Sequence, residues 1–471
     1  MTVRFFNTQS KKIEIFKTIE ENKVRMYVCG PTVYDFLHIG NARALVVFDS
    51  IKRFLEHVGY KVIYVQNFTD IDDKIINKAI RENVSCNDIA EKFIREAKID
   101  MLGLNLKQAL NPRATQEIDS MIEMINLLIK KKCAYRIENS IYFDTTKYKN
   151  YGRLSKKKLN ELMHGNRVEI DLNKKNPNDF ILWKESKISE IGFNSPWGFG
   201  RPGWHIECSA MSKKYLGEEI DIHAGGEDLI FPHHENEIAQ SESCSGKTFS
   251  RYWLHNGFIN IDDKKMSKSE NNFFTIREIS KEFSYMAIRF FILSSHYRSP
   301  INFTKENLKS SQNSYERIKN CLNNIYFYLE QNLNTSNINR KELEVLQNID
   351  KEIFNFNNYL ADDFNTSKAL ASFFIIIKYI NININGDSSN EFIKKLKDII
   401  LILCEILGFK FDSDTKIKKN NDEINRKVLS MLKKRDLAKK NKDWILADQI
   451  RDDLKKMGIK IEDTANGTRI V

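Results

Sequence analysis

The sequence predicts an α/β protein with an inserted subdomain, a helical bundle and a small C-terminal domain. Short apolar strands at residues 24–34 and 61–70 flank the helical pattern "NARALVVFDSIKRFLEHVG", which together form a βαβ unit. Helical patterns continue to about residue 132, and residues 133–200 then carry short strands and turns. From about residue 300, periodic helices predict a bundle, and a basic helical segment follows it.

Length and composition limit the class of protein. The 471 residues are 41% hydrophobic, which is enough for about two to four domains. No apolar run approaches the roughly 18 residues of a membrane span, and the N-terminus lacks an apolar signal core. The seven cysteines are odd in number and form no CxxC pair, which fits a reducing compartment. We therefore expect a cytoplasmic protein without a membrane partner.

The positive charge is concentrated near the C-terminus. The chain has a net charge of +11, and residues 416–442 carry eleven Lys or Arg against three Asp or Glu. Clustered cations suit a polyanionic partner such as a nucleic acid. The solvated face of an ordinary helix would look the same, so charge alone does not decide between the two interpretations.

The stretch "FLHIGNAR" marks a candidate phosphate site. A strand breaks at Gly30-Pro31, and His38, Gly40 and Asn41 follow where the next helix begins. A helix N-terminus offers unpaired N–H groups and partial positive charge to an anion. Gly40 leaves room for a flat base, while His38 and Asn41 could donate to phosphate oxygens. A simple helix cap is the alternative.

The stretch "KMSKS" supplies two lysines, Lys265 and Lys268, after the apolar strand "GFINI". An isolated lysine pair is ordinarily solvated. Together with "HIGN", however, the pattern resembles the two signatures of class I aminoacyl-tRNA synthetases. The resemblance implies that Lys268, supported by Lys265, meets the charge that develops on pyrophosphate as the α-phosphate is attacked.

Three separate stretches carry metal-ligand side chains. Cys29 ends the first strand, "RPGWHIECSAM" brings Cys208, and "FPHHENEIAQSE" brings His233 and Glu237. If the last stretch is helical, His233 and Glu237 lie four apart on one face. Two thiolates, an imidazole and a carboxylate would suit zinc. Cys29 and Cys208 could instead be ordinary buried core residues.

Six stretches in order resemble the cysteinyl-tRNA synthetase family of bacteria: "CGPTVYDFLHIGNAR", "PRATQEI", "SPWGFGRPGWHIECSAM", "FPHHENEIAQSE", "KMSKS" and "DDFNT". They extend from residue 29 to 366. The resemblance implies one Zn²⁺ per chain, held by Cys29, Cys208, His233 and Glu237, with the substrate thiol meeting the metal as a thiolate. Zinc favours a soft thiolate over a hydroxyl that stays protonated, whereas an apolar pocket rejects a near-isostere poorly.

The same resemblance implies further roles. The cysteine pocket is expected to contain Thr69, Trp204 and Asp228, with Asp228 pairing with the α-ammonium, although Trp204 could be core packing. The zinc floor would be supported by His205, His223, His234 and His255. The catalytic residues would be His38, Asn41, Lys265 and Lys268, and ATP would contact His38, Gly40, Asn41 and Lys268, with Mg²⁺ accompanying the nucleotide.

Two segments depart from the family pattern, and one pair near the C-terminus fits base recognition. Ala224 replaces a usual glycine before "GG", and Glu270-Asn271 replaces a usual Leu-Gly after "KMSKS". Trp444 and Asp448 lie four apart, on one helical face, and suit an unpaired anticodon base. Trp444 could instead anchor the core of a small domain.

The resemblance implies a complete architecture and reaction. A Rossmann-like catalytic domain at residues 1–114 and 201–305 would be interrupted by an acceptor-end subdomain at 115–200. A helical bundle at 306–405 and an anticodon-binding domain at 406–471 would follow. The chain, a monomer, would make cysteinyl-adenylate from L-cysteine and ATP and transfer cysteine to the 3′ end of tRNA(Cys).

Two other functions share parts of this pattern. An amide-forming cysteine ligase that acts on an amino sugar would keep zinc and adenylation, but it would not need the basic residues 416–442. A non-catalytic RNA-binding protein would not need intact "HIGN" and "KMSKS" stretches.

Overall fold

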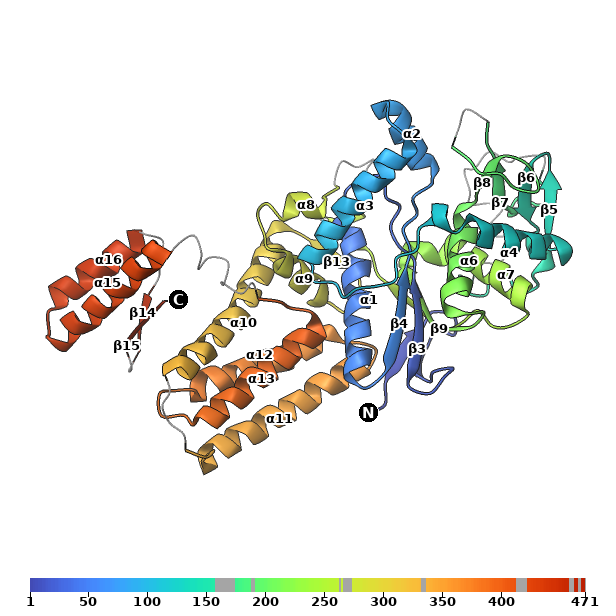
Figure 1. The fold of residues 1–471 in the computed structure, drawn as a ribbon. Coiled ribbons are helices and arrows are strands. Elements are labelled where there is room, and N and C mark those ends of the chain that lie inside the picture. The colour runs from blue at the N-terminus through green and yellow to red at the C-terminus, as the bar shows by residue number, and fades with distance from the viewer. Residues whose placement is uncertain are drawn as a thin grey trace. The chain divides into compact units, whose positions relative to one another are not determined.

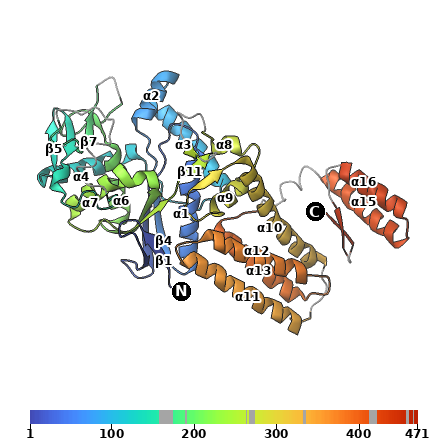
Figure 2. The same cartoon turned by 180° about the vertical axis from the view of Figure 1, so that it is seen from behind.

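The structure is a computed structural model, and it describes most of the chain. The described residues are 1–156, 174–187, 191–261, 264–265, 273–331, 336–411, 422–456, 461–464 and 467–470. They belong to two compact units (Figures 1 and 2). The first unit contains Met1–Tyr315, Asp350–Ile376 and Leu403–Phe409, and the second contains Glu316–Ile349, Ile377–Ile402 and Lys410–Val471.

A four-stranded parallel sheet in the order β10-β9-β3-β4 is the centre of the first unit (Figure 1). Its strands are β3 (Lys23–Val28), β4 (Lys61–Gln66), β9 (Ile220–Gly226) and β10 (Ser250–Asn256). Helix α1 (Ile39–His57) connects β3 to β4 and buries a long row of apolar side chains. The predicted βαβ unit and α/β class are therefore confirmed.

Strand β3 is shorter than the predicted residues 24–34. It ends at Val28, because the next residues cannot continue a strand beside β4. A Cβ on Gly30 would lie 1.6 Å from the carbonyl oxygen of Asn67, and Pro31 has no N–H to donate to a ladder. The chain therefore leaves the sheet directly after Cys29, before it enters α1.

A second, antiparallel sheet lies between the two halves of the parallel one in the sequence. Helices α2 (Asp73–Glu82), α3 (Cys86–Gly103) and α4 (Ile118–Lys130) precede it. Its strands, in order, are β5 (Ala134–Ile137), β6 (Ser140–Phe143), β7 (Phe180–Glu185) and β8 (Gly200–Pro202). Helix α6 (Trp204–Leu216) then leads into β9. The sheet falls in the stretch expected as an insertion, residues 115–200, and its last strand extends to Pro202.

The remaining small elements of the first unit frame the parallel sheet. The hairpin β1 (Arg4–Asn7) and β2 (Lys12–Ile15) precedes β3, and α7 (Glu235–Ser245) connects β9 to β10. A three-stranded sheet follows, with β11 (Ile259–Ile261) between β12 (Lys264–Lys265) and β13 (Ile301–Phe303). Helices α8 (Ile276–Ile279) and α9 (Tyr285–Leu293) lie between β12 and β13 in the sequence.

Long helices dominate the rest of the chain, as the apolar periodicity predicts. They are α10 (Lys305–Gln331), α11 (Arg340–Ala361), α12 (Thr366–Asn383) and α13 (Asn390–Leu407). The expected boundary between residues 405 and 406 falls inside α13, whose last turn belongs to the first unit. No helix among the described residues is long and apolar enough to cross a membrane.

The C-terminal part of the second unit is a helical pair with a small hairpin. Helices α15 (Asp422–Lys440) and α16 (Trp444–Lys456) pack on each other, and β14 (Ile461–Thr464) pairs with β15 (Gly467–Ile470). Leu432, Ile450 and Leu454 form its apolar cluster. Arg435, within the basic segment, is buried and donates to the carbonyl of Ala447, so this arginine holds the pair together.

A buried ion cluster ties α1 to α9. The Asp49 carboxylate accepts from Arg53 Nε at 2.9 Å and from Arg289 at 2.5 Å, and all three residues are buried. Burial favours a neutral carboxyl, but Arg289 and Arg53 outweigh it and lower the pKa of Asp49. Arg289 also donates to the carbonyl oxygens of Leu104 and Leu407. The cluster therefore joins four distant segments.

Asp49→Asn should lower the free energy of unfolding by about 3 kcal/mol, because it leaves two buried guanidinium groups without their carboxylate. Chemical denaturation followed by circular dichroism would measure the loss, with the exposed Glu20→Gln as control. Since the folded pKa of Asp49 is lowered, its contribution is complete above the unfolded pKa of about 4 and is lost as pH falls further. A variant as stable as wild type at pH 7 would contradict this account.

Candidate metal and nucleotide site

Cys29 is fixed at the carboxyl edge of the parallel sheet. Its N–H donates to the carbonyl of Ala224 on β9 at 3.2 Å, and the next N–H, of Gly30, donates to Asn67 Oδ1 at 2.9 Å. Because parallel strands end at one edge, residues that follow β3, β4 and β9 meet here. The position of the Cys29 thiol is therefore set by three strands.

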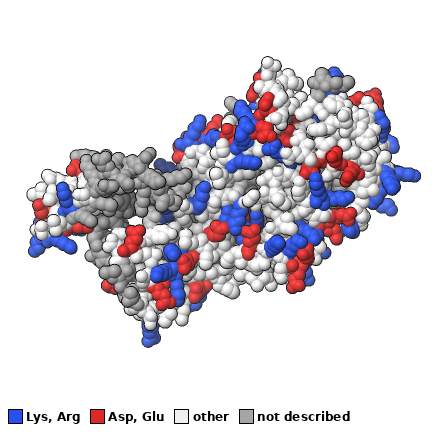
Figure 3. All heavy atoms as spheres, viewed as in Figure 1, with Lys and Arg blue, Asp and Glu red and all other residues white. Residues whose placement is uncertain are grey.

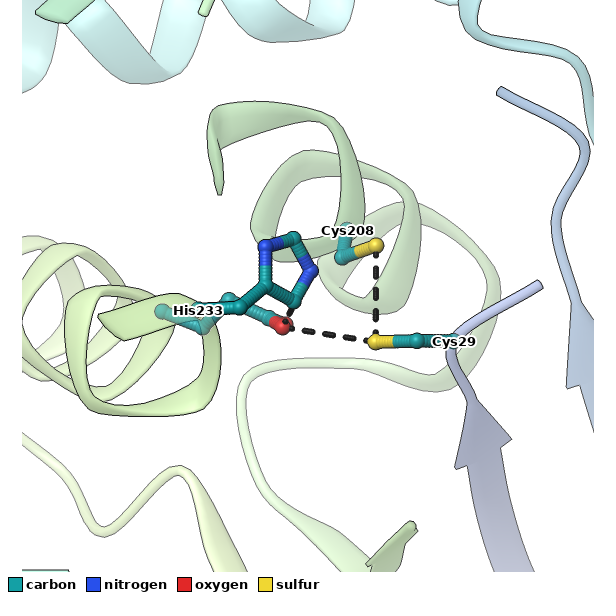
Figure 4. Close-up of side chains that lie close together, drawn as sticks. Cys29, Cys208 and His233 are labelled. Atoms are coloured by element: carbon teal, nitrogen blue, oxygen red, sulfur yellow. Dashed lines mark hydrogen bonds and ion pairs between the residues drawn. The ribbon is translucent and has the colours of Figure 1, made fainter. Parts of the chain in front are cut away.

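Four predicted ligands lie together at this edge. Figure 4 labels three of them, Cys29, Cys208 and His233, which point toward one another. The ligand atoms of Cys29, Cys208, His233 and Glu237 are all within 4.8 Å of one another. Cys29 Sγ lies 3.7 Å from Cys208 Sγ and 3.4 Å from Glu237 Oε1, which lies 3.1 Å from His233 Nε2. Ligands of a tetrahedral zinc ion stand about 3.3–3.8 Å apart, a range that contains both distances from Cys29, and the chemistry of the donor set also suits zinc.

Local structure explains how these side chains converge. Cys208 lies on α6, and His233 lies in a wide turn, Ile230–His234, that runs directly into α7. Glu237 is in the first turn of α7, so the pair is four residues apart on one face, as predicted. The N-terminal turn of a helix also favours a carboxylate.

The cluster is buried, and its ionisable groups shift one another's pKa values. Although burial opposes ionisation, His223 and His233 hold the pKa of Glu237 well below its usual range. Burial lowers the pKa of His233, but Glu237 and Cys208 outweigh it and raise that pKa to about 10. Burial and the nearby Cys208 raise the pKa of Cys29. A soft divalent cation would compensate these buried anionic donors.

Four further histidines surround the ligands, as predicted. His205 Nδ1 lies 2.9 Å from His233 Nδ1, and His223 Nε2 lies 2.8 Å from Glu237 Oε2. His234 bridges Cys29 Sγ, at 3.3 Å, to His255 Nε2, at 2.8 Å. Such contacts orient ligands. The ligand atoms of His223, His234, Cys29 and Glu237 also lie within 4.8 Å of one another. His223 and His234 could therefore contact a metal as well.

A cavity of about 370 Å³ opens beside the cluster. Of the four ligands, Cys29 alone lines it, together with Trp204 and Asp228. Trp204 is 42% exposed and its ring lies 4.2 Å from that of His233, so it is a cavity wall and not core packing. Thr69 is buried, does not line this cavity, and donates to Glu207 at 2.9 Å.

The same cavity reaches the start of α1, where His38, Gly40 and Asn41 line it. The alternative interpretation of this segment, a helix cap, is confirmed, because His38 is the N-cap of α1. Asn41 N–H donates to His38 Nδ1 at 3.2 Å, and His38 N–H donates to Asn41 Oδ1 at 3.1 Å. The N–H groups of Ile39 and Ala42 also donate within the protein, to the carbonyls of Phe274 and His38. Contacts with phosphate would therefore come from His38 Nε2, Asn41 Nδ2 and the N–H of Gly40.

Two residues at the site were missed by sequence reasoning. Asn67 holds Gly30 and contacts Cys208 Sγ at 3.7 Å; a polar residue directly after the apolar run 61–66 was its only signal. Lys74 lines the cavity from α2, with Nζ 5.4 Å from the centre of the Tyr34 ring. It lies in a helix pattern rich in charge, where nothing distinguishes one lysine from another.

The remaining predicted residues lie elsewhere or outside the described part. Lys265 pairs with Asn260 of β11, whereas Lys268 and Glu270-Asn271 lie outside the described residues. Trp444 is 59% exposed and Asp448 is exposed, so Trp444 does not anchor a core. Ala224 is buried in β9; in contrast, a Cβ on Gly225 would lie 2.8 Å from Leu229. Strand β9 therefore accommodates alanine at residue 224, where the family pattern has glycine.

Family models match most of the chain. Residues 15–313 match the model described as "tRNA synthetases class I (C) catalytic domain", and residues 355–412 match the DALR domain. The chain is 48% identical over 475 residues to the cysteine–tRNA ligase of Lachnospira eligens, covering 99% of both chains. It is also 48% identical over 468 residues to that of Clostridioides difficile, again covering 99% of both.

Solved structures resemble the fold at low identity. Mycobacterium tuberculosis methionyl-tRNA synthetase with methionyl-adenylate has a TM-score of 0.58 at 13% identity, covering 82% of this chain and 89% of that one. A putative arginyl-tRNA synthetase of Campylobacter jejuni has a TM-score of 0.55 at 14% identity, covering 84% and 94%. These likenesses support the fold.

Cys208→Ser should weaken metal binding at least about tenfold, because it replaces a thiolate donor with a poor one. Metal content of the purified chain, measured by plasma emission spectrometry after dialysis against a chelator, would show it. Cys244→Ser is the matched control, since Cys244 is buried outside the cluster. Equal metal retention in both variants would remove Cys208 from the site.

Proposed function

Because the chain belongs to the cysteine–tRNA ligase family of class I aminoacyl-tRNA synthetases, we propose that it activates L-cysteine with ATP and esterifies it to tRNA(Cys). The observation that carries this proposal is the shared cavity, which has Cys29 of the metal cluster on one wall and the start of α1 on another. The alternative with an amino-sugar acceptor is not supported, since the relatives are cysteine–tRNA ligases along the full chain.

The metal ligands are proposed to hold one Zn²⁺ per chain through Cys29, Cys208, His233 and Glu237. Bound zinc would favour a substrate thiolate over the hydroxyl of serine. His223 and His234 keep Glu237 and Cys29 in place from behind the donor atoms. In a reducing cytoplasm, where we place the protein, the two thiols stay available as ligands.

The amino-acid pocket is proposed to lie between Trp204 and Asp228. The exposed Asp228 carboxylate at the cavity wall would pair with the α-ammonium, and the Trp204 ring would cover the substrate side chain. Thr69 acts at a distance in this proposal: its hydroxyl holds Glu207, the residue before Cys208. It is a positioning residue.

Adenylation is proposed to occur at the start of α1. The cysteine carboxylate attacks the α-phosphorus of ATP, an O–P bond forms, and the bond to the leaving pyrophosphate breaks. His38, Gly40, Asn41 and the helix N-terminus would hold the phosphates, with Mg²⁺ accompanying ATP. Lys268, supported by Lys265, would neutralise the charge that grows on pyrophosphate.

Transfer is proposed to use tRNA(Cys) as acceptor. A hydroxyl of its terminal ribose attacks the carbonyl carbon of the adenylate, the ester forms, and AMP leaves with the electron pair of the broken bond. The insertion at 115–200 would receive the acceptor end, and α15 and α16 would read the anticodon. The proposal needs only one chain, so we expect a monomer.

Cysteine should drive exchange of pyrophosphate into ATP at least roughly a thousandfold more efficiently than serine, since the site selects by a soft donor contact. Exchange of labelled pyrophosphate, run with each amino acid in turn, measures activation without tRNA. Serine-dependent exchange as fast as the cysteine-dependent reaction would overturn the proposed function.

Trp444→Ala and Asp448→Ala should each lower kcat/KM for tRNA(Cys), with a loss of transition-state stabilisation of about 1–3 kcal/mol. Pyrophosphate exchange should stay unchanged. Both residues are exposed on α16, so the substitutions should not unfold the helical pair. Asp453→Ala, an exposed carboxylate on another side of α16, is the matched control. If all three variants charged tRNA like wild type, this face of α16 would not be the anticodon reader.

A further inference from the structure

The "DDFNT" stretch carries a buried carboxylate that the proposed function does not use. Asp363 lies in the turn between α11 and α12, and its side chain is almost fully buried in the first unit. Asp363 and Phe364 both have left-handed backbones, with φ of 57° and 50°. Two consecutive non-glycine residues rarely adopt this conformation, so the surrounding contacts must hold it.

The Asp363 carboxylate gathers donors from two other segments. Oδ1 accepts from Tyr297 Oη at 2.9 Å and from the backbone N–H of Phe6 at 2.8 Å. Oδ2 accepts from Arg298 Nε at 2.8 Å and also from the second guanidinium nitrogen of Arg298. A bidentate, charge-assisted pair of this kind fixes the relative orientation of the two side chains and also stabilises the fold. Asp363 thus fixes the side chains of Tyr297 and Arg298.

A second buried charge fixes the backbone of the same segment. Arg43 of α1 is fully buried and donates to the carbonyl oxygens of Tyr297, at 3.2 Å, and Ser299. It also donates to the carbonyl of Phe258. The segment 296–299 is therefore held twice: Asp363 holds the side chains of Tyr297 and Arg298, and Arg43 holds the carbonyls of Tyr297 and Ser299.

This segment supports one wall of the nucleotide cavity. Gly257 N–H donates to the carbonyl of Tyr297 at 2.9 Å, and a Cβ on Gly257 would lie 2.7 Å from the carbonyl oxygen of Arg298. Gly257, Phe258 and Arg43 line the same cavity as the start of α1. A shift of residues 296–299 would therefore move this wall directly, because no space separates the two backbones.

We propose that Asp363 is a positioning residue for ATP: through Tyr297 and Arg298 it sets the backbone on which the Gly257–Phe258 wall of the nucleotide cavity rests. This inference rests on the proposed use of that cavity for ATP. Asp363 touches no reacting atom in this account. It acts through the wall, so its loss should affect the nucleotide and spare the metal cluster and the amino acid.

The test is Asp363→Asn in the full chain, which keeps the shape of the side chain and removes its charge. The dissociation constant of a non-hydrolysable ATP analogue should rise about fivefold, as expected for one weakened charged contact. Zinc content and the dissociation constant of cysteine should stay at wild-type values. Asp362→Asn is the matched control: its side chain is 53% exposed, and it pairs with Arg4 at 2.9 Å.

A second variant keeps the test decisive if Asp363→Asn does not fold. Tyr297→Phe removes only the hydroxyl that donates to Asp363, and it should raise the same constant about threefold. The proposal is overturned if folded variants bind the analogue like Asp362→Asn. It is also overturned if zinc and cysteine binding fall in parallel with nucleotide binding, which would indicate a merely structural role.

The two hypotheses fail separately. If the wild-type chain showed no cysteine-dependent pyrophosphate exchange, the proposed function would be contradicted. The affinity for the ATP analogue would still show whether Asp363 shapes the cavity.

Discussion

The position of the Cys29 thiol is the constraint on which the site depends. It must end a buried strand, join three donors from other segments and still reach the cavity. The bonds from the N–H groups of Cys29 and Gly30 to Ala224 and Asn67 achieve this, and they leave no room for a side chain at residue 30. Selection of a substrate one atom different from serine requires a donor set placed this rigidly, because packing alone discriminates weakly.

The rest of the first unit supports two separate demands on one cavity. The metal end concentrates buried anionic donors and keeps them ordered with a second layer of histidines. The other end of the cavity is the N-terminus of α1, where His38 and Asn41 cap each other's backbone. Two buried arginines join segments distant in sequence: Arg43, which lines the cavity, and Arg289, which pairs with Asp49. A buried charge that lost its partner would destabilise the fold, so these contacts favour one arrangement of the segments.

Sequence reasoning predicted what depends on local pattern or on motif wording. The βαβ unit follows from apolar periodicity, and the His233–Glu237 pair follows from helical spacing. The early end of β3 at Val28 was missed because the contact between Gly30 and Asn67 is non-local. Thr69 also differs from expectation, since its hydroxyl holds Glu207 and does not line the cavity. Burial of Arg435 and exposure of Trp444 depend on how α15 meets α16, which composition does not encode.

The central claim is that the Cys29 cluster holds a metal that recognises the substrate through sulfur. Absorption spectroscopy of the cobalt-substituted chain tests it most directly, because each sulfur donor adds charge-transfer intensity in the near ultraviolet. Titration with L-cysteine should raise this intensity above that of Cys29 and Cys208 alone, and L-serine at the same concentrations should leave it unchanged. A spectrum that cysteine does not alter, in chain that still forms the adenylate, would contradict the account.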